Sequence, residues 1–351
     1  MRRLIISSIL VLILSPLPVF AEAPKLQDNV PNRYVVVPGD TLWGIAGRFL
    51  KNPWKWPELW GENREEIQNP HLIYPGDVIV LDTSGGTPHL RVLSSSQVSS
   101  DGGAPPNLET VRLSPGIQTR DLGRAIPSIP ISAIAPFLNN TRIVEEKSWN
   151  EAPKVVSGDN YDYILGAGSS AFVEGLPSGS IVRWDIFRKG RKIFDPDSGK
   201  LLGVQVDYCG EGRVTKFDHP SRIDIVKSTR EIDVGDRLYP TVDSLITHYI
   251  PHSPDTQVKG RILSADGKTT QIGQNDVVLL NIGTQDGIEL GDVLAVYRKG
   301  KDIVSGRKVD VTLPDDRIGL VLVFRAYEHV SYALVMQSKD TISASDTVKT
   351  P

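Results

Sequence analysis

The sequence has few of the residues that support metal or covalent chemistry. Its 351 residues include one cysteine and six histidines, so an internal disulfide is excluded. Cys209 lies among acidic residues, whereas a reactive thiolate needs a nearby cation or a helix N-terminus. His248 and His252 are close in sequence, but Pro251 between them prevents the helix that would place both on one face for zinc. We predict no metal site, no cofactor and a half-buried apolar role for Cys209.

Arrangements typical of glycosidases and of dinucleotide-binding enzymes are also missing. The acid pairs Glu145-Glu146 and Asp315-Asp316 are adjacent in the chain, whereas glycosidase carboxylates face each other across a cleft. The segment 166–168, Gly-Ala-Gly, lacks the third glycine of a dinucleotide loop and runs into a strand-like segment. We therefore predict that the protein is not an enzyme.

Long apolar runs are confined to the first 21 residues. Arg2 and Arg3 precede a mainly apolar stretch over residues 4–14, and small residues follow where a signal peptidase cleaves. We predict a signal peptide at residues 1–21 with cleavage after Ala21. The apolar stretch is shorter than the roughly 20 residues that span a bilayer, so we expect no stable membrane anchor after cleavage.

Basic residues are not in excess. The chain has 39 Lys and Arg against 42 Asp and Glu, and loss of Arg2 and Arg3 with the signal peptide leaves a net charge of −5. A nucleic-acid partner requires a clustered basic surface, so we predict none. An exported chain without disulfides fits the bacterial periplasm better than eukaryotic secretion, and we predict a periplasmic location.

Residues 33–82 have the pattern of one small module. A strand begins at Tyr34, Pro38-Gly39 forms a tight turn, and Asp40 is placed to cap the helix after it. That helix has one apolar stripe at helical spacing, made of Leu42, Ile45, Ala46 and Phe49.

The second half of the module is predicted to contain a helix, a loop and a strand. A helix is predicted to start near Pro57, with Trp56, Leu59 and Trp60 on its inner face. A turn-rich loop over residues 69–77 then leads to a last strand, Val78–Leu81. The predicted order of elements is βααβ.

Three blocks in this order, YVVVPGDTLWGIA, WKWPELWGENREEI and NPHLIYPGDVIVL, resemble the LysM family. The resemblance implies binding to glycans that contain N-acetylglucosamine, here the glycan strands of bacterial peptidoglycan. It also implies a shallow groove between the loop before the first helix and the loop before the last strand. Carried onto this sequence, the groove residues are Gly39, Asp40, Thr41 and Leu42 on one wall and Asn69, Leu72, Ile73 and Tyr74 on the other.

Elementary chemistry agrees with a neutral groove at this place. An N-acetyl group offers one N–H donor, one carbonyl acceptor and a methyl, so exposed backbone amides beside small apolar side chains can recognise it. The alternative for Gly39, Asp40, Gly76 and Asp77 is that they serve turn geometry alone. Among the tryptophans, we predict Trp56 and Trp60 in the core, whereas Trp43 and Trp54 are within possible reach of a sugar.

The remaining chain divides by composition. Residues 83–110 are rich in Ser, Gly and Pro and are predicted to form a flexible linker. Residues 111–158 are predicted to form a proline-punctuated connector, in which the spacing of Ile131, Ile134 and Leu138 indicates one short helix docked on the domain after it.

From residue 160 onward, short apolar runs alternate with Gly and Asp turns, which indicates strands. Residues 221–239 and 331–349 align without a gap, and upstream Phe187-Arg188-Lys189-Gly190 matches Tyr297-Arg298-Lys299-Gly300 at the same offset of 110 residues. We predict an internal repeat, with two related small β-domains at residues 160–240 and 256–350. The predicted fold class is α+β, with a mainly-β C-terminal region.

The glycine and strand spacing of these β-domains weakly resembles the small barrel of flagellar assembly protein T. The pattern is carried by residues 286–294 and again by residues 231–238. We predict a wall-binding protein whose β-domains hold an envelope protein partner. The alternatives are a wall-remodelling enzyme with an unrecognised site and a subunit of an envelope-spanning export or motility complex.

Overall fold

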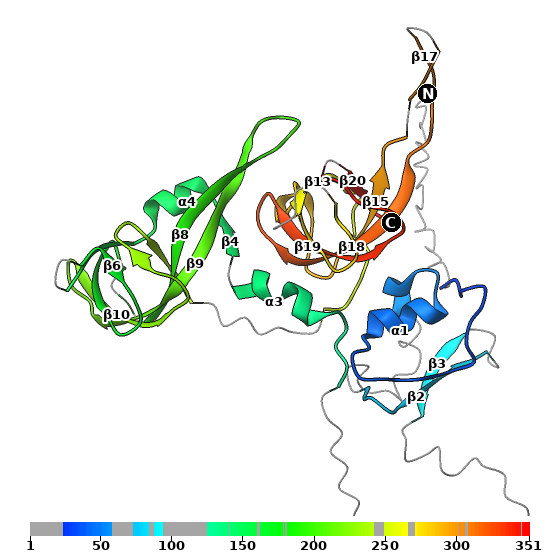
Figure 1. Cartoon of the computed structure of the whole chain (residues 1–351), viewed down its shortest axis with the longest axis horizontal. Coiled ribbons are helices and arrows are strands. Elements are labelled where there is room, and N and C mark those ends of the chain that lie inside the picture. Colours follow the sequence, from blue (N-terminus) through cyan, green and yellow to red (C-terminus); the bar gives the residue numbers. More distant parts are fainter. Residues whose placement is uncertain are drawn as a thin grey trace, which may run out of the picture.

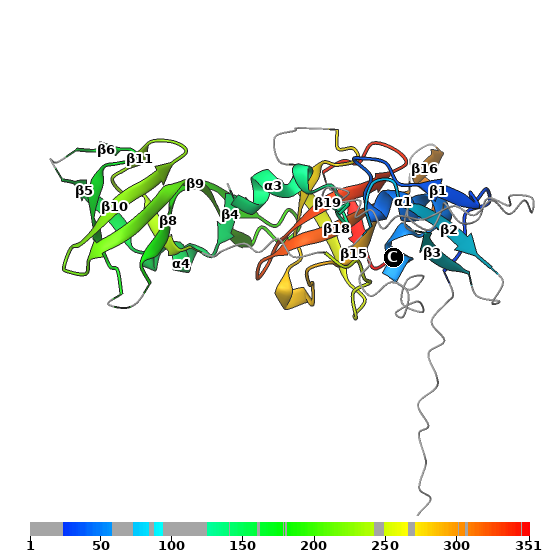
Figure 2. The same ribbon diagram turned by 90° about the horizontal axis from the view of Figure 1, so that it is seen from below.

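The computed structural model describes most of the chain as three lobes. The described residues are 24–57, 73–83, 88–93, 125–139, 141–159, 162–177, 179, 181–241, 249–265, 271–300, 302–305, 308–344 and 346–351. We name the lobes the N-terminal lobe (residues 24–93), the first barrel (141–241) and the second barrel (256–350). Figures 1 and 2 show that the second barrel, although last in sequence, lies between the other two lobes. The predicted signal peptide lies outside the described residues.

The N-terminal lobe packs one helix on a three-stranded sheet. The sheet has the order β1-β2-β3, with β1 at Arg33–Val35, β2 at Val78–Asp82 and β3 at His89–Leu93. Helix α1, Leu42–Phe49, has the predicted apolar stripe buried, and a short 3-10 helix, η1, lies after it at Pro53–Lys55. The strand β3 corrects the prediction of a linker over 83–110, because Leu90 is fully buried and the segment pairs along its length with β2.

The first barrel is a closed ring of strands with one more strand at its side. Its strands are β4 (Thr141–Val144), β5 (Lys154–Gly158), β7 (Ser170–Glu174), β8 (Arg183–Phe194), β9 (Leu201–Lys216), β10 (Ser221–Ser228) and β12 (Arg237–Pro240). They form a seven-stranded sheet in the order β10-β7-β5-β12-β8-β9-β4, and β10 also pairs with β9. That extra pairing closes a ring and leaves β4 outside it. The domain therefore starts near residue 141 and not at residue 160, because β4 and β5 lie in the predicted connector.

Smaller elements complete the first barrel. Helix α4, Glu146–Glu151, comes after β4, and the short strands β6 (Ile164–Leu165) and β11 (Ile232–Asp233) pair with each other. The interior is filled by alternating residues of the ring strands, among them Val173, Ile186, Cys209 and Ile223.

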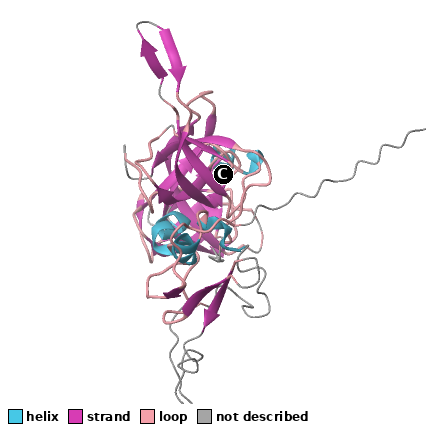
Figure 3. Cartoon of the chain, turned by 90° about the vertical axis from the view of Figure 1, so that its right-hand side faces the viewer, coloured by secondary structure: helices cyan, strands magenta, loops and turns pink. Residues whose placement is uncertain are grey.

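The second barrel has the same order of strands around its ring. It consists of β13 (Lys259–Ala265), β14 (Val277–Leu280), β15 (Val293–Arg298), β18 (Asp316–Ala326), β19 (Ser331–Ser338) and β20 (Thr347–Lys349), and a short 3-10 helix, η3, lies at Thr284–Asp286. The ring runs β13-β14-β19-β18-β15-β20, which matches β5-β7-β10-β9-β8-β12 of the first barrel in chain order. A hairpin of β16 (Asp302–Ser305) and β17 (Lys308–Thr312) is inserted between β15 and β18, and it projects from the barrel in Figures 1 and 3.

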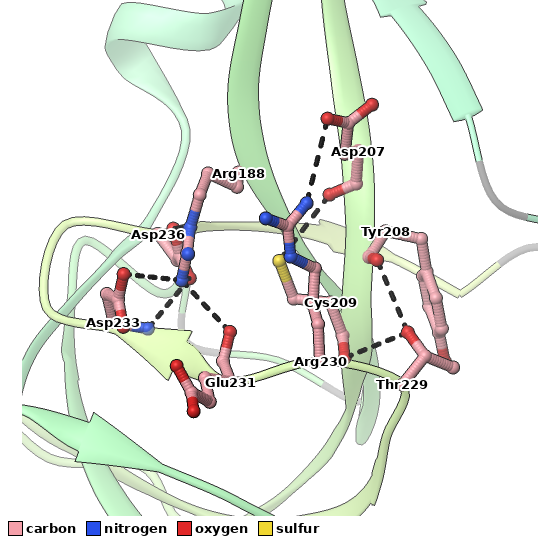
Figure 4. Close-up of polar contacts among 9 residues, drawn as sticks. All are labelled: Arg188, Asp207, Tyr208, Cys209, Thr229, Arg230, Glu231, Asp233 and Asp236. Carbon is pink, nitrogen blue, oxygen red and sulfur yellow. Dashed lines mark hydrogen bonds and ion pairs between the residues drawn. The ribbon is translucent and has the colours of Figure 1, made fainter. Parts of the chain in front are cut away.

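An arginine at the same place in each barrel holds the loop before the last ring strand. In the first barrel, the Arg188 guanidinium donates to both carboxylate oxygens of Asp236 at 3.0 and 2.8 Å and to the Glu231 carbonyl at 2.9 Å; Figure 4 shows this group beside Cys209. In the second barrel, Arg298 donates to the Thr341 carbonyl, 110 residues after Glu231. The hydrogen bonds to Asp236 raise the pKa of Arg188 further above its usual value.

The second barrel is apolar on both faces of its strands. Alternate residues such as Val278 and Leu280 fill its interior, while Val277 and Leu279 point outward into a second buried cluster. The outer cluster is covered by α3, Ile131–Asn139, through Ile134. It is also covered by residues from the other two lobes, Trp43 and the β8-β9 hairpin residues Ile193 and Leu202.

Helix α3 lies where the isoleucine spacing predicted it, but it docks on the second barrel and not on the domain that directly follows it in the chain. Its C-terminal carbonyls need partners, because the last turn of a helix leaves them without intrahelical bonds. One nitrogen of Arg325, on β18, donates to the carbonyls of Phe137, Leu138 and Thr141 at 2.8, 3.2 and 3.1 Å. A cation at this end is also favoured by the helix dipole. In the described part of the chain, no helix is long and apolar enough to cross a membrane.

Replacement of Arg188 tests how much its ion pair stabilises the first barrel. Asp236 is 5% exposed, so Arg188→Met leaves a buried carboxylate without the cation that pairs with it. We expect a loss of about 3 kcal/mol, the lower end for a broken buried pair, because the guanidinium itself is partly exposed. Urea denaturation with pulsed hydrogen exchange of β8 and β12 measures this.

The matched control is Arg230→Met, whose partner Asp207 is 3.7 Å away and whose side chain is well exposed. An exposed pair contributes little, so we expect a change within about 0.5 kcal/mol. Equal losses in the two variants would contradict the assignment.

Candidate functional site

The first wall of the predicted groove is a turn closed by an aspartate. The Asp40 N–H donates to the Val37 carbonyl at 3.2 Å, and its carboxylate accepts from the Val37 N–H at 2.9 Å. Gly39 has a φ of +95°, which is the left-handed region that favours glycine. The Tyr34 hydroxyl also donates to the Asp40 carboxylate at 2.9 Å. Partial burial and this hydrogen bond raise the pKa of Tyr34.

The helix cap lies one residue later than the sequence predicted. Thr41, and not Asp40, is the N-cap of α1, because its hydroxyl accepts from the Gly44 N–H at 3.1 Å. Asp40 cannot cap the helix because its carboxylate is already used by the preceding turn.

The second wall repeats the same turn. The Asp77 N–H donates to the Tyr74 carbonyl at 3.0 Å, and the Asp77 carboxylate accepts from the Tyr74 N–H at 2.9 Å. Gly76 has a φ of +98°. Asp77 is buried, so this turn is a fixed part of the lobe and not a free loop tip.

Backbone hydrogen bonds hold the two turns side by side. The Val36 N–H donates to the Asp77 carbonyl at 2.9 Å, and the Gly76 N–H donates to the Val36 carbonyl at 2.8 Å. These bonds extend the pairing of β1 with β2 into the loops. The structure therefore brings together the described parts of both predicted walls.

The predicted groove residues differ in how much they expose. Gly39 is exposed, and Asp40, Thr41 and Tyr74 are half-buried. Leu42 and Ile73 are buried in the core of the lobe, so their side chains are not available to a ligand. The remaining two, Asn69 and Leu72, lie outside the described residues.

The tryptophans do not face an open groove. Trp56 is buried in the core of the lobe, as predicted. Trp43 is 5% exposed and packs into the outer cluster of the second barrel, and Trp54 packs against the same cluster. Their use as a sugar platform is therefore unsupported, because another lobe covers these faces. Trp60 and Leu59 lie outside the described residues.

A segment that sequence reasoning missed lies against both walls. Residues 125–130 precede α3, and Ile126 is buried in the core of the N-terminal lobe. The Ile126 N–H donates to the Ile73 carbonyl at 2.9 Å, while the carbonyls of Pro127 and Ser128 accept from the N–H groups of Leu42 and Trp43 at 3.0 and 3.2 Å. All three bonds are between backbone groups, so no side-chain motif signals them.

The described residues that were considered for metal or covalent chemistry are buried or contact a neighbouring side chain. Cys209 is fully buried inside the first barrel, deeper than the half-burial predicted, and burial raises the pKa of its thiol to about 12. A thiol with such a pKa is not a thiolate near neutral pH. Of the two neighbouring histidines, His248 lies outside the described residues and His252 contacts Asp292 at 3.1 Å. Among the described residues, no group of three or more His, Cys, Asp or Glu could hold a metal ion.

Replacement of two glycines of the N-terminal lobe by alanine should change its stability in opposite directions. Gly39→Ala places a side chain at φ +95° with no atom within 4 Å of the new Cβ, so its cost is conformational, about 1 kcal/mol. Gly47→Ala lies inside α1, and its new Cβ would be in ordinary contact with Pro53 at 3.5 Å. Alanine is favoured there by about 0.5–1 kcal/mol. Amide hydrogen exchange of α1 in the full chain measures both, and stabilisation by Gly39→Ala would refute the turn assignment.

Comparison with known proteins agrees with this geometry. The family model described as LysM domain matches residues 34–82. A relative, the uncharacterized protein YqbP of Bacillus subtilis (strain 168), is 37% identical over 62 residues, which cover 15% of this chain and 28% of the relative. The chain thus spans about a quarter of the length of this relative. The N-terminal lobe contains a LysM domain at residues 34–82, a carbohydrate-binding module.

Proposed function

We propose that this protein binds the glycan strands of peptidoglycan in the periplasm without cleaving them. The observation that carries the proposal is the LysM match over residues 34–82, on a lobe whose two Gly-Asp turns are held side by side.

The proposed groove would recognise the N-acetyl groups of the glycan through backbone atoms. Gly39 is exposed and has no side chain to block a sugar, and the aspartates on either side are already engaged by their own turns. The recognition is therefore neutral and polar, which suits an acetamido group better than a charged one. The walls are Gly39, Asp40, Thr41 and Leu42 against Asn69, Leu72, Ile73 and Tyr74.

The location rests on the sequence. The apolar stretch after Arg2 and Arg3 has the length and the flanking charge of a cleavable signal peptide. A periplasmic protein would meet the peptidoglycan layer directly. The proposal includes release of the mature chain after cleavage at Ala21.

We also propose that the two barrels, related to each other by an internal repeat, hold an envelope protein partner. Their shared ring order and the same arginine contact 110 residues apart support a common origin. At the β6-β11 pair of the first barrel, Tyr163 and Ile164 are 76% and 64% exposed, and Val234 beside them is also exposed. Exposed apolar side chains that lie together mark interaction surfaces more often than chance placement does. The resemblance to flagellar assembly protein T stays a prediction.

The first test is binding to isolated peptidoglycan. We expect the mature chain to co-sediment with purified sacculi and to release no soluble muropeptides, measured by chromatography of the supernatant. Binding without release supports an anchor, in line with the burial of Cys209 and the contact between His252 and Asp292. Release of muropeptides would instead establish the alternative, a wall-remodelling enzyme.

The second test separates binding from folding within the groove. Tyr74→Asp keeps the backbone bonds of the turn but places a charge on the second wall, so we expect affinity for chitin hexamer to fall about tenfold or more, which corresponds to about 1.4 kcal/mol. Stability should change by about 0.5 kcal/mol, since the residue is half-buried.

The control is Asn32→Asp, on the same lobe, at an exposed position before β1, at the end of that strand away from both turns. It adds the same charge and should bind as the unaltered protein does. Isothermal titration with oligomers of increasing length, beside thermal melts, measures both variants. Unchanged affinity in a folded Tyr74→Asp protein would remove this wall from the site.

A further inference from the structure

The two walls of the proposed groove are bridged by a segment from a distant part of the same chain. Residues 125–130 are bound from one side by the Ile73 carbonyl, which accepts from the Ile126 N–H, and from the other side by the first N–H groups of α1. Figure 1 shows the chain leading from α3 to the N-terminal lobe beside α1. Side chains anchor the segment at two places, because Ile126 is buried in the core of the N-terminal lobe and Ile129 in the outer cluster of the second barrel.

The segment uses the donors that a ligand at the start of α1 would need. The first N–H groups of a helix have no intrahelical acceptor and must be satisfied from outside. Here Leu42 and Trp43 donate to the carbonyls of Pro127 and Ser128, and Gly44 donates to the Thr41 hydroxyl. A sugar that uses the Leu42 or Trp43 N–H must therefore displace the segment.

The chemistry of the segment matches that of the proposed ligand. A backbone peptide group and an N-acetyl group are both secondary amides, each with one N–H donor and one carbonyl acceptor. The sequence of the segment, Ala-Ile-Pro-Ser-Ile-Pro, carries no charge, as expected for an occupant of a neutral groove.

We propose that residues 125–130 occupy the glycan groove as an internal competitor, so that peptidoglycan binds after this segment has left. The inference rests on the proposed function of the groove. A site that is open only for a fraction of the time binds its ligand with an affinity reduced by that fraction. The segment continues into α3, which packs on the second barrel. Release of the segment would therefore remove a connection between the N-terminal lobe and the second barrel, so glycan binding and the attachment of the lobe are coupled.

The test is to eject the segment without changing the walls. In the mature full-length protein, Ile126→Asp places a charge in the buried position that anchors the segment. We expect chitin hexamer, the probe used, to bind about tenfold more tightly or better, measured by isothermal titration. The matched control, Asn32→Asp, adds the same charge to the same lobe and should leave the affinity unchanged.

A second measurement needs no variant. Hydrogen exchange at the Ile126 amide of the unaltered protein should become faster when hexamer is saturating, because the bond to Ile73 is broken. Slower or unchanged exchange overturns the proposal, since the segment would then stay in place beside the sugar.

The failures of the two proposals are distinguishable. Equal affinity of the unaltered and Ile126→Asp proteins, with intact exchange protection of α1, overturns the competitor and leaves the glycan site. No binding of hexamer or sacculi by any variant overturns the proposed function, and the competitor with it.

Discussion

One hydrogen bond from backbone to side chain recurs at the turns of all three lobes: an aspartate carboxylate accepts from the backbone N–H three residues before it. These contacts, 2.7–2.9 Å long, are made by Asp40, Asp77, Asp236, Asp276, Asp286, Asp292 and Asp346. In four of them the preceding residue is a glycine with φ between +95° and +100°. The carboxylate closes the turn and fixes where the next strand or helix starts, so these acidic side chains have a structural role.

The sequence predicted the elements that side chains specify. The strand, turn and helix of the LysM domain and the helix at Ile131–Asn139 agree with apolar spacing, because burial of one stripe dictates both. The α+β class with a mainly-β C-terminal region is confirmed. The prediction that Asp40 caps helix α1 was wrong. An aspartate carboxylate can either cap a helix or close a turn, and the Asp40 carboxylate closes the preceding turn. The strand β3 was missed because Ser and Gly residues around it indicated a linker.

Contacts between distant segments could not be predicted in the same way. The bonds from Leu42 and Trp43 to Pro127 and Ser128 join backbone atoms, which every residue has, so no residue type marks them. Trp43 illustrates the same limit for side chains. Its aromatic ring suits a sugar face or a core equally, and only the position of the second barrel decides that it is buried. Of the groove, the sequence therefore indicates the turns but not the segment that lies between them.

The second barrel has an outward apolar layer, with Leu320, Phe324 and Tyr332 lying under α3, the N-terminal lobe and the hairpin of the first barrel. This layer is packed together with residues from all three lobes, whereas Tyr163 and Ile164 of the first barrel are exposed. The rate of amino-acid substitution should therefore be lowest in the second barrel and highest at the exposed parts of the other two lobes. A substitution in the outward layer of the second barrel would need matching changes in segments more than a hundred residues away, so the three lobes would evolve as one unit.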